Sequence, residues 1–380
     1  MTYQSVDELQ KAMAKDVFHY TKDSKKAAGR ALGTLVEIIT FYLLKSWQLE
    51  RNIAIERPIQ EYMNPDITHN VEYSLHPSKE LDKLTMTTVG RLTSNKILKE
   101  SKRIQRIIKS PISVKSNQLL SKSNVLRNAC TMGTFEGGFI NSYLDGFKNG
   151  KPIMSLYSLV EHPFAIVECK RVGVEEGMKK GPQTIEKAKQ GAYVARTVSS
   201  LQKIRMNNGE IGGIINLSEN KIYYKTYDVL LKEVVNSNKK SLLKDFVLTV
   251  GVVSNHGNWF TSDKHNKELK VLAQSYDWLL FLTDKGLAIF IEDLILDPKQ
   301  KYAAIKKAFL ASYTGNKGKN QFTKVQISLE ADEALQDYFN YNIKNIEQWF
   351  NIITPKNNSM NKLKNQLTQL SNKNWEMILK

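Results

Sequence analysis

Residues 164–171 read Phe-Ala-Ile-Val-Glu-Cys-Lys-Arg, an apolar run that ends in charged residues. This pattern predicts a β-strand, in which successive side chains point to opposite faces of a sheet. Glu168 and Lys170 then share one face, while Ala165, Val167 and Cys169 share the other. Because an acid and an ammonium lie together on an otherwise apolar strand, we expect a functional site at the polar end of this strand.

A second acid, Asp145, precedes this strand in residues 141–146, which read Asn-Ser-Tyr-Leu-Asp-Gly. Asn149 and Gly150 follow, and such a pair favours the tight turn of a β-hairpin. We therefore expect strands near 138–147, 152–160 and 164–170. In this arrangement the carboxylates of Asp145 and Glu168 could converge with the ammonium of Lys170.

Asp145 and the Glu168-x-Lys170 pair resemble the motif of the PD-(D/E)xK nuclease superfamily, whose largest enzymatic branch is the type II restriction endonucleases. The surrounding pattern is similar as well. A helix at 117–130, the three strands, a helix at 183–203 and a strand at 211–216 would follow the α-β-β-β-α-β order of the family core. The resemblance implies a fold of the α/β (α+β) class. A mixed central β-sheet would be flanked by helices, and further helices and loops would surround this core.

The resemblance also implies the chemistry of the site. Phosphodiester hydrolysis of this kind uses a divalent metal, and Mg²⁺ prefers oxygen ligands. Asp145, Glu168 and the backbone carbonyl of Cys169 would hold the ion, while Lys170 would orient the attacking water and stabilise the developing charge. The alternative is an ordinary strand end, at which Glu168 forms an ion pair with a neighbouring lysine.

Two predicted helices contribute further candidates. Apolar residues recur at spacings of three and four over residues 24–50, which predicts a long helix, and Glu37 interrupts its apolar stripe. Glu37 resembles the accessory acid that many restriction endonucleases carry on the helix before the sheet; the alternative is a solvent-facing glutamate. Gln190, three residues before Tyr193 on the predicted helix 183–203, is similar to the Gln-Tyr pair of recombination-type exonucleases, in which the spacing is usually four. An exposed helix glutamine is the alternative.

The charge balance indicates a polyanionic partner. Lys and Arg number 55 against 38 Asp and Glu, which gives a net charge of +17. Part of this surplus could be solvated surface, because Lys, Asn and Ile are abundant throughout. The positive charge is dense over residues 91–110, where isoleucines at helical spacing predict an amphipathic helix. Four basic side chains on its polar face would contact the phosphate backbone: Lys99, Lys102, Arg103 and Arg106. The alternative is an ordinary surface helix whose basic side chains contact only solvent.

Two polar loops could also contact double-stranded DNA. A predicted strand at 245–253 runs into Asn255, His256 and Asn258, whose side chains are of the kind that reads base edges. Lys317 and Lys319 lie beside glycines in residues 314–321, where backbone amides could approach phosphates. Both segments also have the composition of ordinary turns or of a flexible basic loop.

The organisation of the chain follows from coarser signals. We expect a catalytic region over 1–215 and a second α/β region over 216–380 that serves DNA recognition or dimerisation, with helices in two pieces over 329–380 broken near Pro355. No signal peptide and no uninterrupted apolar run of membrane-spanning length stands out, so we expect a cytoplasmic protein. Cys130 and Cys169 lie far apart and are expected to be free thiols.

These observations predict a Mg²⁺-dependent, site-specific endonuclease of double-stranded DNA. By analogy with enzymes that cut both strands of a palindrome, we expect a homodimer. Two alternatives stay open: a structure-dependent or exonucleolytic nuclease of repair or recombination, and a DNA-binding protein without catalytic activity.

Overall fold

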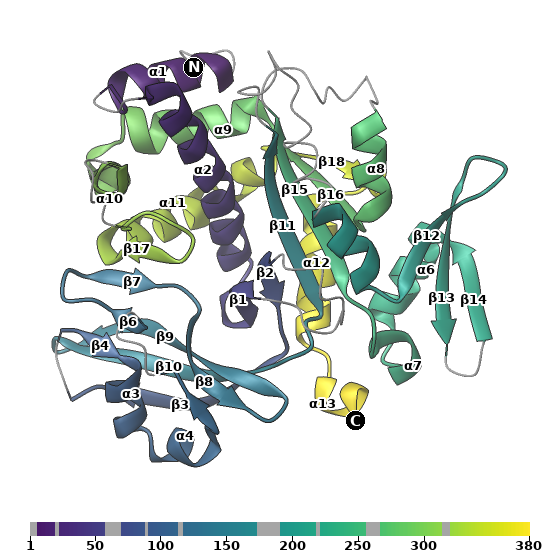
Figure 1. Cartoon of the computed structure of the whole chain (residues 1–380), viewed down its shortest axis with the longest axis horizontal. Helices are drawn as coiled ribbons and strands as arrows, with labels where there is room; N and C mark the ends of the chain where they lie inside the picture. Colours follow the sequence, from purple (N-terminus) through teal and green to yellow (C-terminus); the bar gives the residue numbers. More distant parts are fainter. Residues whose placement is uncertain are drawn as a thin grey trace.

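A six-stranded mixed β-sheet forms the centre of the protein in the computed structural model (Figure 1). The structure describes residues 6–19, 23–57, 70–87, 90–112, 117–172, 191–217, 221–255, 267–313 and 320–380. The strands lie in the order β1 (Ile53–Arg57), β2 (Val71–Leu75), β11 (Ala165–Val172), β15 (Leu248–Asn255), β16 (Trp278–Leu282) and β18 (Phe350–Thr354). β11, β15 and β16 are parallel, and the other neighbours are antiparallel. The mixed α/β class is therefore confirmed.

Apolar residues dominate the parallel strands, apart from the charged end of β11, because helices cover both faces of the sheet. Every residue of β16 is buried. On one face, Ala165 and Val167 of β11 join the core of α2 (Ser24–Ser46), α1 (Val6–Asp16) and α11 (Leu329–Glu347). On the other face, Ile166 packs against Val194 and Val198 of a helix at 191–198, and α8 (Lys267–Ser275) lies beside it. The alternation expected for residues 164–171 therefore separates two layers of core.

A long insertion, residues 78–160, separates β2 from β11 and forms the lower left of Figure 1. It contains a five-stranded sheet in the order β3 (Ser78–Thr85), β10 (Lys151–Val160), β9 (Gly138–Lys148), β8 (Cys130–Phe135) and β5 (Ser110–Pro111). The insertion also contributes three strands to a four-stranded sheet, and β17 (Gln326–Ser328) from the C-terminal part of the chain completes it. The order of its strands is β17, β7 (Val125–Arg127), β6 (Gln118–Leu120) and β4 (Leu92–Thr93). The insertion also carries two short helices, α3 (Ser94–Glu100) and α4 (Lys102–Ile107).

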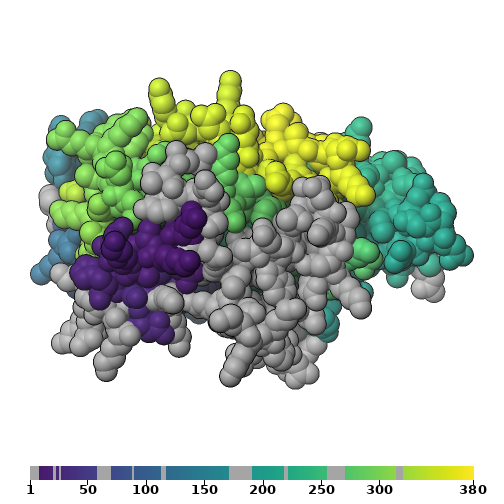
Figure 2. Space-filling view, turned by 90° about the horizontal axis from the view of Figure 1, so that it is seen from above, coloured from purple at the N-terminus to yellow at the C-terminus, as the bar shows by residue number. Residues whose placement is uncertain are grey.

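A three-stranded arm projects at the opposite end of the molecule (Figures 1 and 2). It consists of β12 (Leu201–Arg205), β13 (Ile211–Leu217) and β14 (Lys221–Thr226). The remaining helical segments are η1 (Glu50–Asn52), α6 (Tyr227–Asn236), α7 (Lys240–Leu243), α9 (Asp284–Ile291), η3 (Glu292–Leu296), η4 (Gln300–Tyr302), α10 (Ala303–Tyr313), α12 (Met360–Ser371) and α13 (Trp375–Leu379). Figure 2 shows the N-terminal helix against the green segments, where Phe18 packs on Phe309.

Several predicted elements are confirmed and others are wrong. The three predicted strands are β9, β10 and β11, the long N-terminal helix is α2, and α11 and α12 are the two C-terminal pieces, with β18 between them. The predicted helix at 117–130 is instead β6, β7 and the start of β8, because Asn124 takes a left-handed conformation with φ 54° in the turn between the first two. The predicted basic helix is broken at Ser101, which caps α4. The strand at 211–216 exists as β13, but it lies in the arm.

The expected boundary between 1–215 and 216–380 does not divide the protein. Strands from both sides of it, β11 and β15, are adjacent in the central sheet. One buried cluster runs from Leu9 to Ile378 and includes residues of both halves. The two proposed regions therefore share a sheet and a core.

The helix α2 has a property that the sequence analysis missed. By length and composition alone, residues 27–46 would suffice to cross a membrane. In the structure, 72% of the most apolar window is buried within the protein, where it packs on β11 and α11. The core helix of a protein that does not span a membrane passes the same test of length and composition.

Candidate active site

Four glutamates and two lysines gather where α2 meets the first three strands of the central sheet. They form the Glu/Lys cluster, whose members are Glu37 of α2, Glu56 of β1, Glu72 of β2, Glu168 and Lys170 of β11, and Lys324, which precedes β17. The predicted pair Glu168 and Lys170 is confirmed as neighbours on one face of β11. The predicted candidate Glu37 lies in the same cluster. Glu56, Glu72 and Lys324 also belong to it, although their sequence pattern did not mark them as candidates.

The strand register explains why three of the glutamates meet. Tyr73 of β2 pairs with Val167 on one side and with Ile55 on the other. One residue further along, Glu72 therefore lies between Glu168 and Glu56 in a row across three neighbouring strands. The hydroxyl of Tyr73 donates a hydrogen bond of 2.7 Å to the carbonyl oxygen of Glu37, which fixes α2 against this row.

The two ammonium groups alternate with the carboxylates. Lys170 Nζ lies 3.4 Å from Glu168 Oε2 and 3.8 Å from Glu72 Oε1. Lys324 Nζ lies 3.4 Å from Glu37 Oε2 and 2.9 Å from Glu56 Oε1, and it also forms an ion pair with Glu72. Glu72 is thus the acid that both lysines share.

The inner part of the cluster is shielded from solvent, whereas Glu56 is exposed, and carboxylates outnumber ammonium groups among its members. Glu168 is 1% exposed and Lys324 is 6% exposed. Burial raises the pKa of Glu37, although the charge of Lys324 counteracts part of this effect. Four carboxylates against two ammonium groups leave two negative charges when all are ionised. An excess of carboxylates in a partly buried site favours the binding of a cation.

Close packing around Glu168 requires two glycines. A Cβ atom at Gly191, within the helical residues 191–198, would lie 2.8 Å from the hydroxyl oxygen of Tyr276 and 3.5 Å from Glu168 Oε2. A Cβ atom at Gly251 would lie 2.8 Å from the ring of the same tyrosine. Burial, together with the nearby Glu168 and Cys169, raises the pKa of Tyr276 well above its usual value. A phenol that stays protonated therefore lies beside the buried carboxylate.

The backbone at Glu56 is strained. Its φ of 50° lies in the left-handed region, which non-glycine residues rarely adopt. Such conformations cost on the order of 1–3 kcal/mol and are concentrated at functional sites. In this case the strained residue is one of the three acids that contact Lys324.

Asp145 is not part of the cluster, which corrects our expectation. It belongs to β9 in the five-stranded sheet, where its carboxylate lies 2.6 Å from Arg51 Nη2 and accepts a hydrogen bond of 3.0 Å from Ser155. Lys83 is 4.0 Å away. The hairpin of β9 and β10 pairs with β3 and β8, whereas β2 takes the place beside β11. Asp145 instead lines a separate cavity of about 180 Å³.

The other candidates fall into two groups. Lys99, Lys102, Arg103 and Arg106 are exposed on α3 and α4, at the outer side of the insertion in Figure 1. Gln190, His256, Asn258, Lys317 and Lys319 lie outside the described residues, as does the side chain of Asn255 at the end of β15. The thiol of Cys169 is buried, which raises its pKa, and ligation by its backbone carbonyl stays a prediction. Both cysteines are free, as expected.

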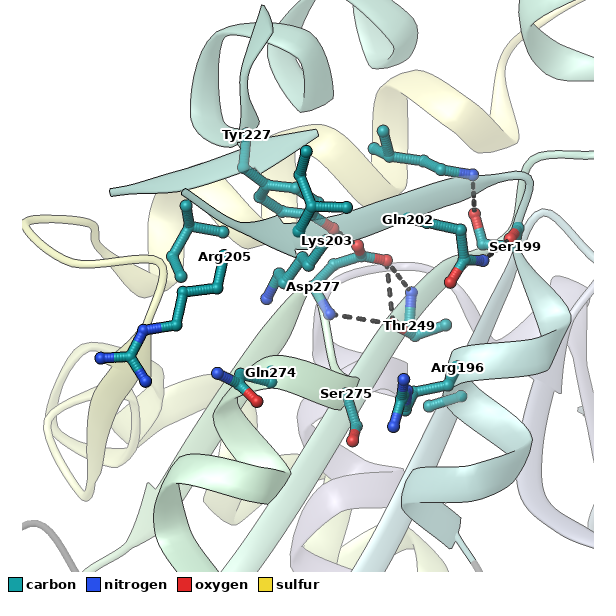
Figure 3. A pocket seen from close by; sticks show the side chains of 14 residues that line it. Arg196, Ser199, Gln202, Lys203, Arg205, Tyr227, Thr249, Gln274, Ser275 and Asp277 are labelled. Atoms are coloured by element: carbon teal, nitrogen blue, oxygen red, sulfur yellow. Dashed lines mark hydrogen bonds between the residues drawn. The ribbon is translucent and has the colours of Figure 1, made fainter. Parts of the chain in front are cut away.

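Figure 3 shows a small basic pocket. It lies on the sheet face that carries Glu168, because Thr249 in its lining pairs with Ile166, two residues before Glu168 on β11. It has a volume of about 100 Å³ and is lined by Arg196 of the helix 191–198 and by Lys203 and Arg205 of β12. Lys203 donates hydrogen bonds to the carbonyl oxygens of Ala273 and Tyr276, and its burial lowers its pKa. This cavity is called the basic pocket below.

The acid of the basic pocket is already engaged. Asp277 accepts hydrogen bonds of 2.7 and 2.9 Å from the amide and the hydroxyl of Thr249, and burial raises its pKa. Figure 3 shows the exposed Arg196 and Arg205 on either side of this group. Their guanidinium groups are therefore the charges of the pocket that could meet an anion.

Comparison with known proteins gives no further guide to the site. No protein-family model, no curated protein and no solved structure matches this chain.

Proposed function

We propose that the chain is a Mg²⁺-dependent nuclease of the PD-(D/E)xK type that hydrolyses double-stranded DNA at specific sites, with its active site in the Glu/Lys cluster. The observation that carries the proposal is the row of Glu56, Glu72 and Glu168 across three strands, with Lys170 between two of them. Glu72 takes the place that we first gave to Asp145.

The order of the elements supports this proposal. α2, β1, β2, β11, the helix 191–198 and β15 follow one another in the order α-β-β-β-α-β. The three strands pair antiparallel, and β15 joins β11 in parallel. The resemblance implies such an order; here it would be built from other segments than expected, and it is interrupted by the insertion at 78–160 and by the arm with α6 and α7 at 201–243.

The residues of the cluster fit Mg²⁺ in their chemistry and in their charge. Carboxylate oxygens are the ligands that this ion prefers, and its positive charge would offset the excess of carboxylates over ammonium groups in the cluster. Glu72 would be the central ligand, because it forms ion pairs with both Lys170 and Lys324. Glu168 lies on one side of it, and Glu37 and Glu56 lie on the other. Among the described residues, no three acidic, histidine or cysteine side chains are arranged to hold a metal ion. Lys324 instead lies among Glu37, Glu56 and Glu72.

The residues of the chain have separate tasks in this reaction. A bound divalent ion would lower the pKa of a water molecule and neutralise phosphate oxygens. Lys170, held by Glu168 and Glu72, would orient the attacking water and stabilise the negative charge that develops on the phosphate. Tyr276 and the helix 191–198 exclude bulk water from the inner side of Glu168. The basic pocket and the exposed cations of α3 and α4 would contact phosphates along the duplex.

Digestion of a supercoiled plasmid with the purified chain and Mg²⁺ tests the proposal. Discrete fragments that disappear with EDTA are the expected result. A smear or shortening from the ends would favour a repair or recombination nuclease. Retarded but intact DNA would show that the chain binds DNA without cutting it, and would contradict the proposal.

A further inference from the structure

We propose that Lys324 is an internal cation that occupies the metal position of the Glu/Lys cluster until a divalent ion displaces it. This inference rests on the proposed function, because it assigns a role to Lys324 in metal binding by the same site. Three acids from three different elements surround its ammonium group: Glu37 of α2, Glu56 of β1 and Glu72 of β2.

The surroundings of Lys324 are those of a cation-binding point. An ammonium group donates three hydrogen bonds, and here each of them has a carboxylate within reach. Oxygen atoms from three acids around one buried point would equally suit a metal ion, which cannot occupy that point together with the ammonium. The same lysine therefore explains why the described residues contain no ready metal site although four glutamates lie close together.

The backbone of Lys324 is anchored, so that displacement needs only the side chain to move. The carbonyl oxygen of Lys324 accepts a hydrogen bond of 2.9 Å from Asn128 Nδ2. On either side, the amide of Asn128 donates to Val325, and the amide of Thr323 donates to Gln326. Phe322 is fully buried against Phe309. A lysine side chain has four carbon atoms and several rotamers, so its ammonium group can leave while these contacts remain.

The charges favour exchange of the two cations. With Lys324 in place, the cluster keeps two negative charges, and exchange for a divalent ion leaves one. A metal that must first displace the ammonium group loses the free energy of that contact. The measured metal affinity is therefore lower than the cluster would show without Lys324.

Lys324 also stabilises the cluster when no metal is present. Without a cation, Glu37, Glu56 and Glu72 would repel one another in a partly buried site. Loss of the ammonium group should thus lower the thermal stability in EDTA, and a bound metal should restore it.

The test uses Mn²⁺ as the probe and the full chain without DNA. Lys324→Met removes the charge and keeps most of the side-chain length. Lys301→Met is the control, because Lys301 is exposed and, in the described part of the chain, its ion pair is with Asp337 alone. Calorimetric titration should show at least about tenfold tighter Mn²⁺ binding for Lys324→Met than for the wild type. In EDTA, the Tm of Lys324→Met should be lower than the Tm of the wild type. Addition of Mn²⁺ should raise the Tm of Lys324→Met by more than it raises the Tm of the wild type. Unchanged or weaker Mn²⁺ binding by Lys324→Met would overturn the inference.

A measurement on the wild-type protein covers the case in which Lys324→Met does not fold. Acetic anhydride modifies accessible lysines, and mass spectrometry measures the extent at each site. Acetylation of Lys324 should increase when Mn²⁺ is added, because its ammonium group moves out of the cluster, while Lys301 should not respond. Equal acetylation of Lys324 with and without Mn²⁺ would overturn the inference.

The results also separate this inference from the proposed function. If the wild type cuts DNA with Mg²⁺ but Lys324 responds to Mn²⁺ in neither experiment, the inference fails and the nuclease proposal stands. If the wild type neither binds Mn²⁺ nor cuts DNA, the proposed function fails, and Lys324 is a permanent partner of the three acids.

Discussion

Glu72 of β2 and Lys170 of β11 lie 3.8 Å apart on adjacent antiparallel strands, although the whole insertion at 78–160 separates them in sequence. This contact joins the Glu168-x-Lys170 pair to the other acids of the Glu/Lys cluster. It also defines which carboxylate belongs to the candidate site. The consequences can be measured residue by residue.

Lys170 should be required for the rate of cleavage and not for binding. Lys170→Met should lower the single-turnover rate by at least about a hundredfold, because a positioned group that stabilises developing charge is lost. Lys170→Arg should restore little, since the guanidinium group is larger and planar. Quenched-flow or gel-based single-turnover kinetics with excess enzyme measure this rate. Cleavage at the wild-type rate would leave Lys170 with a structural role only.

Arg196 and Arg205 of the basic pocket should contribute to DNA affinity through phosphate contacts. Arg196→Gln combined with Arg205→Gln should reduce the slope of log affinity against log salt by about 2. Fluorescence anisotropy at several salt concentrations measures the slope. Lys344→Gln with Lys362→Gln removes the same charge from other exposed positions and serves as the control. Equal slopes for the two double variants would show that only net charge matters.

The cations on α3 and α4 should also follow the phosphate backbone. Neutralising Lys99, Lys102 and Arg106 together should reduce the same slope by about 2 to 3 and weaken binding to all sequences alike. Sequence preference should survive, because phosphate contacts position a protein without reading bases. Competition between specific and random duplexes checks this point. A change in preference would mean that these helices read sequence.

His76 should make the fold sensitive to acid. Its Nδ1 lies 2.8 Å from the carbonyl oxygen of Val160, so it joins the two ends of the insertion, and Ser74 contacts Nε2. Burial lowers the pKa of His76 to about 3, and the nearby Arg57 and His162 contribute less to this shift. In the unfolded chain the imidazole takes up its proton near its usual pKa of about 6.5, so stability falls as the pH drops from there towards 3 and is unaffected above it.

The loss attributable to His76 should reach roughly 4 kcal/mol near pH 3. Urea unfolding of the wild type and of His76→Gln at pH 7.5 and at successively lower pH measures it. The variant should be less stable at neutral pH and should lose less stability in acid. Parallel curves for the two proteins would show that another group causes the acid sensitivity.

The sequence predicted the centre of the site because that part is local. The alternation in residues 164–171 sufficed to predict β11 and to place Glu168 and Lys170 on one face. Glu37 could be proposed because it interrupts the apolar stripe of a long helix. Glu56 and Glu72 had a weaker signal: each lies in a short run with apolar residues on alternate positions. These runs are brief and separated by residues 58–69, and nothing in their pattern shows that the second pairs with β11.

The wrong assignment of Asp145 has a topological cause. A hairpin close in sequence to β11 offered an acid at the expected spacing, but the hairpin pairs within the insertion. Lys324 had no signal at all, because its contact with Glu72 depends on how the segment before β17 packs against the sheet. Pairing between distant segments depends on burial and register, which a single sequence does not display.

The central claim is that Glu72, and not Asp145, completes the site with Glu168. The most direct test is Mg²⁺-dependent plasmid cleavage by Glu72→Gln and Asp145→Asn, with DNA binding measured in parallel in Ca²⁺. Both substitutions remove one negative charge and keep the shape of the side chain. Glu72→Gln should lose cleavage by at least about a thousandfold and bind DNA within about tenfold of the wild type, while Asp145→Asn should cut nearly as fast as the wild type. Full activity of Glu72→Gln together with an inactive, folded Asp145→Asn would contradict this account.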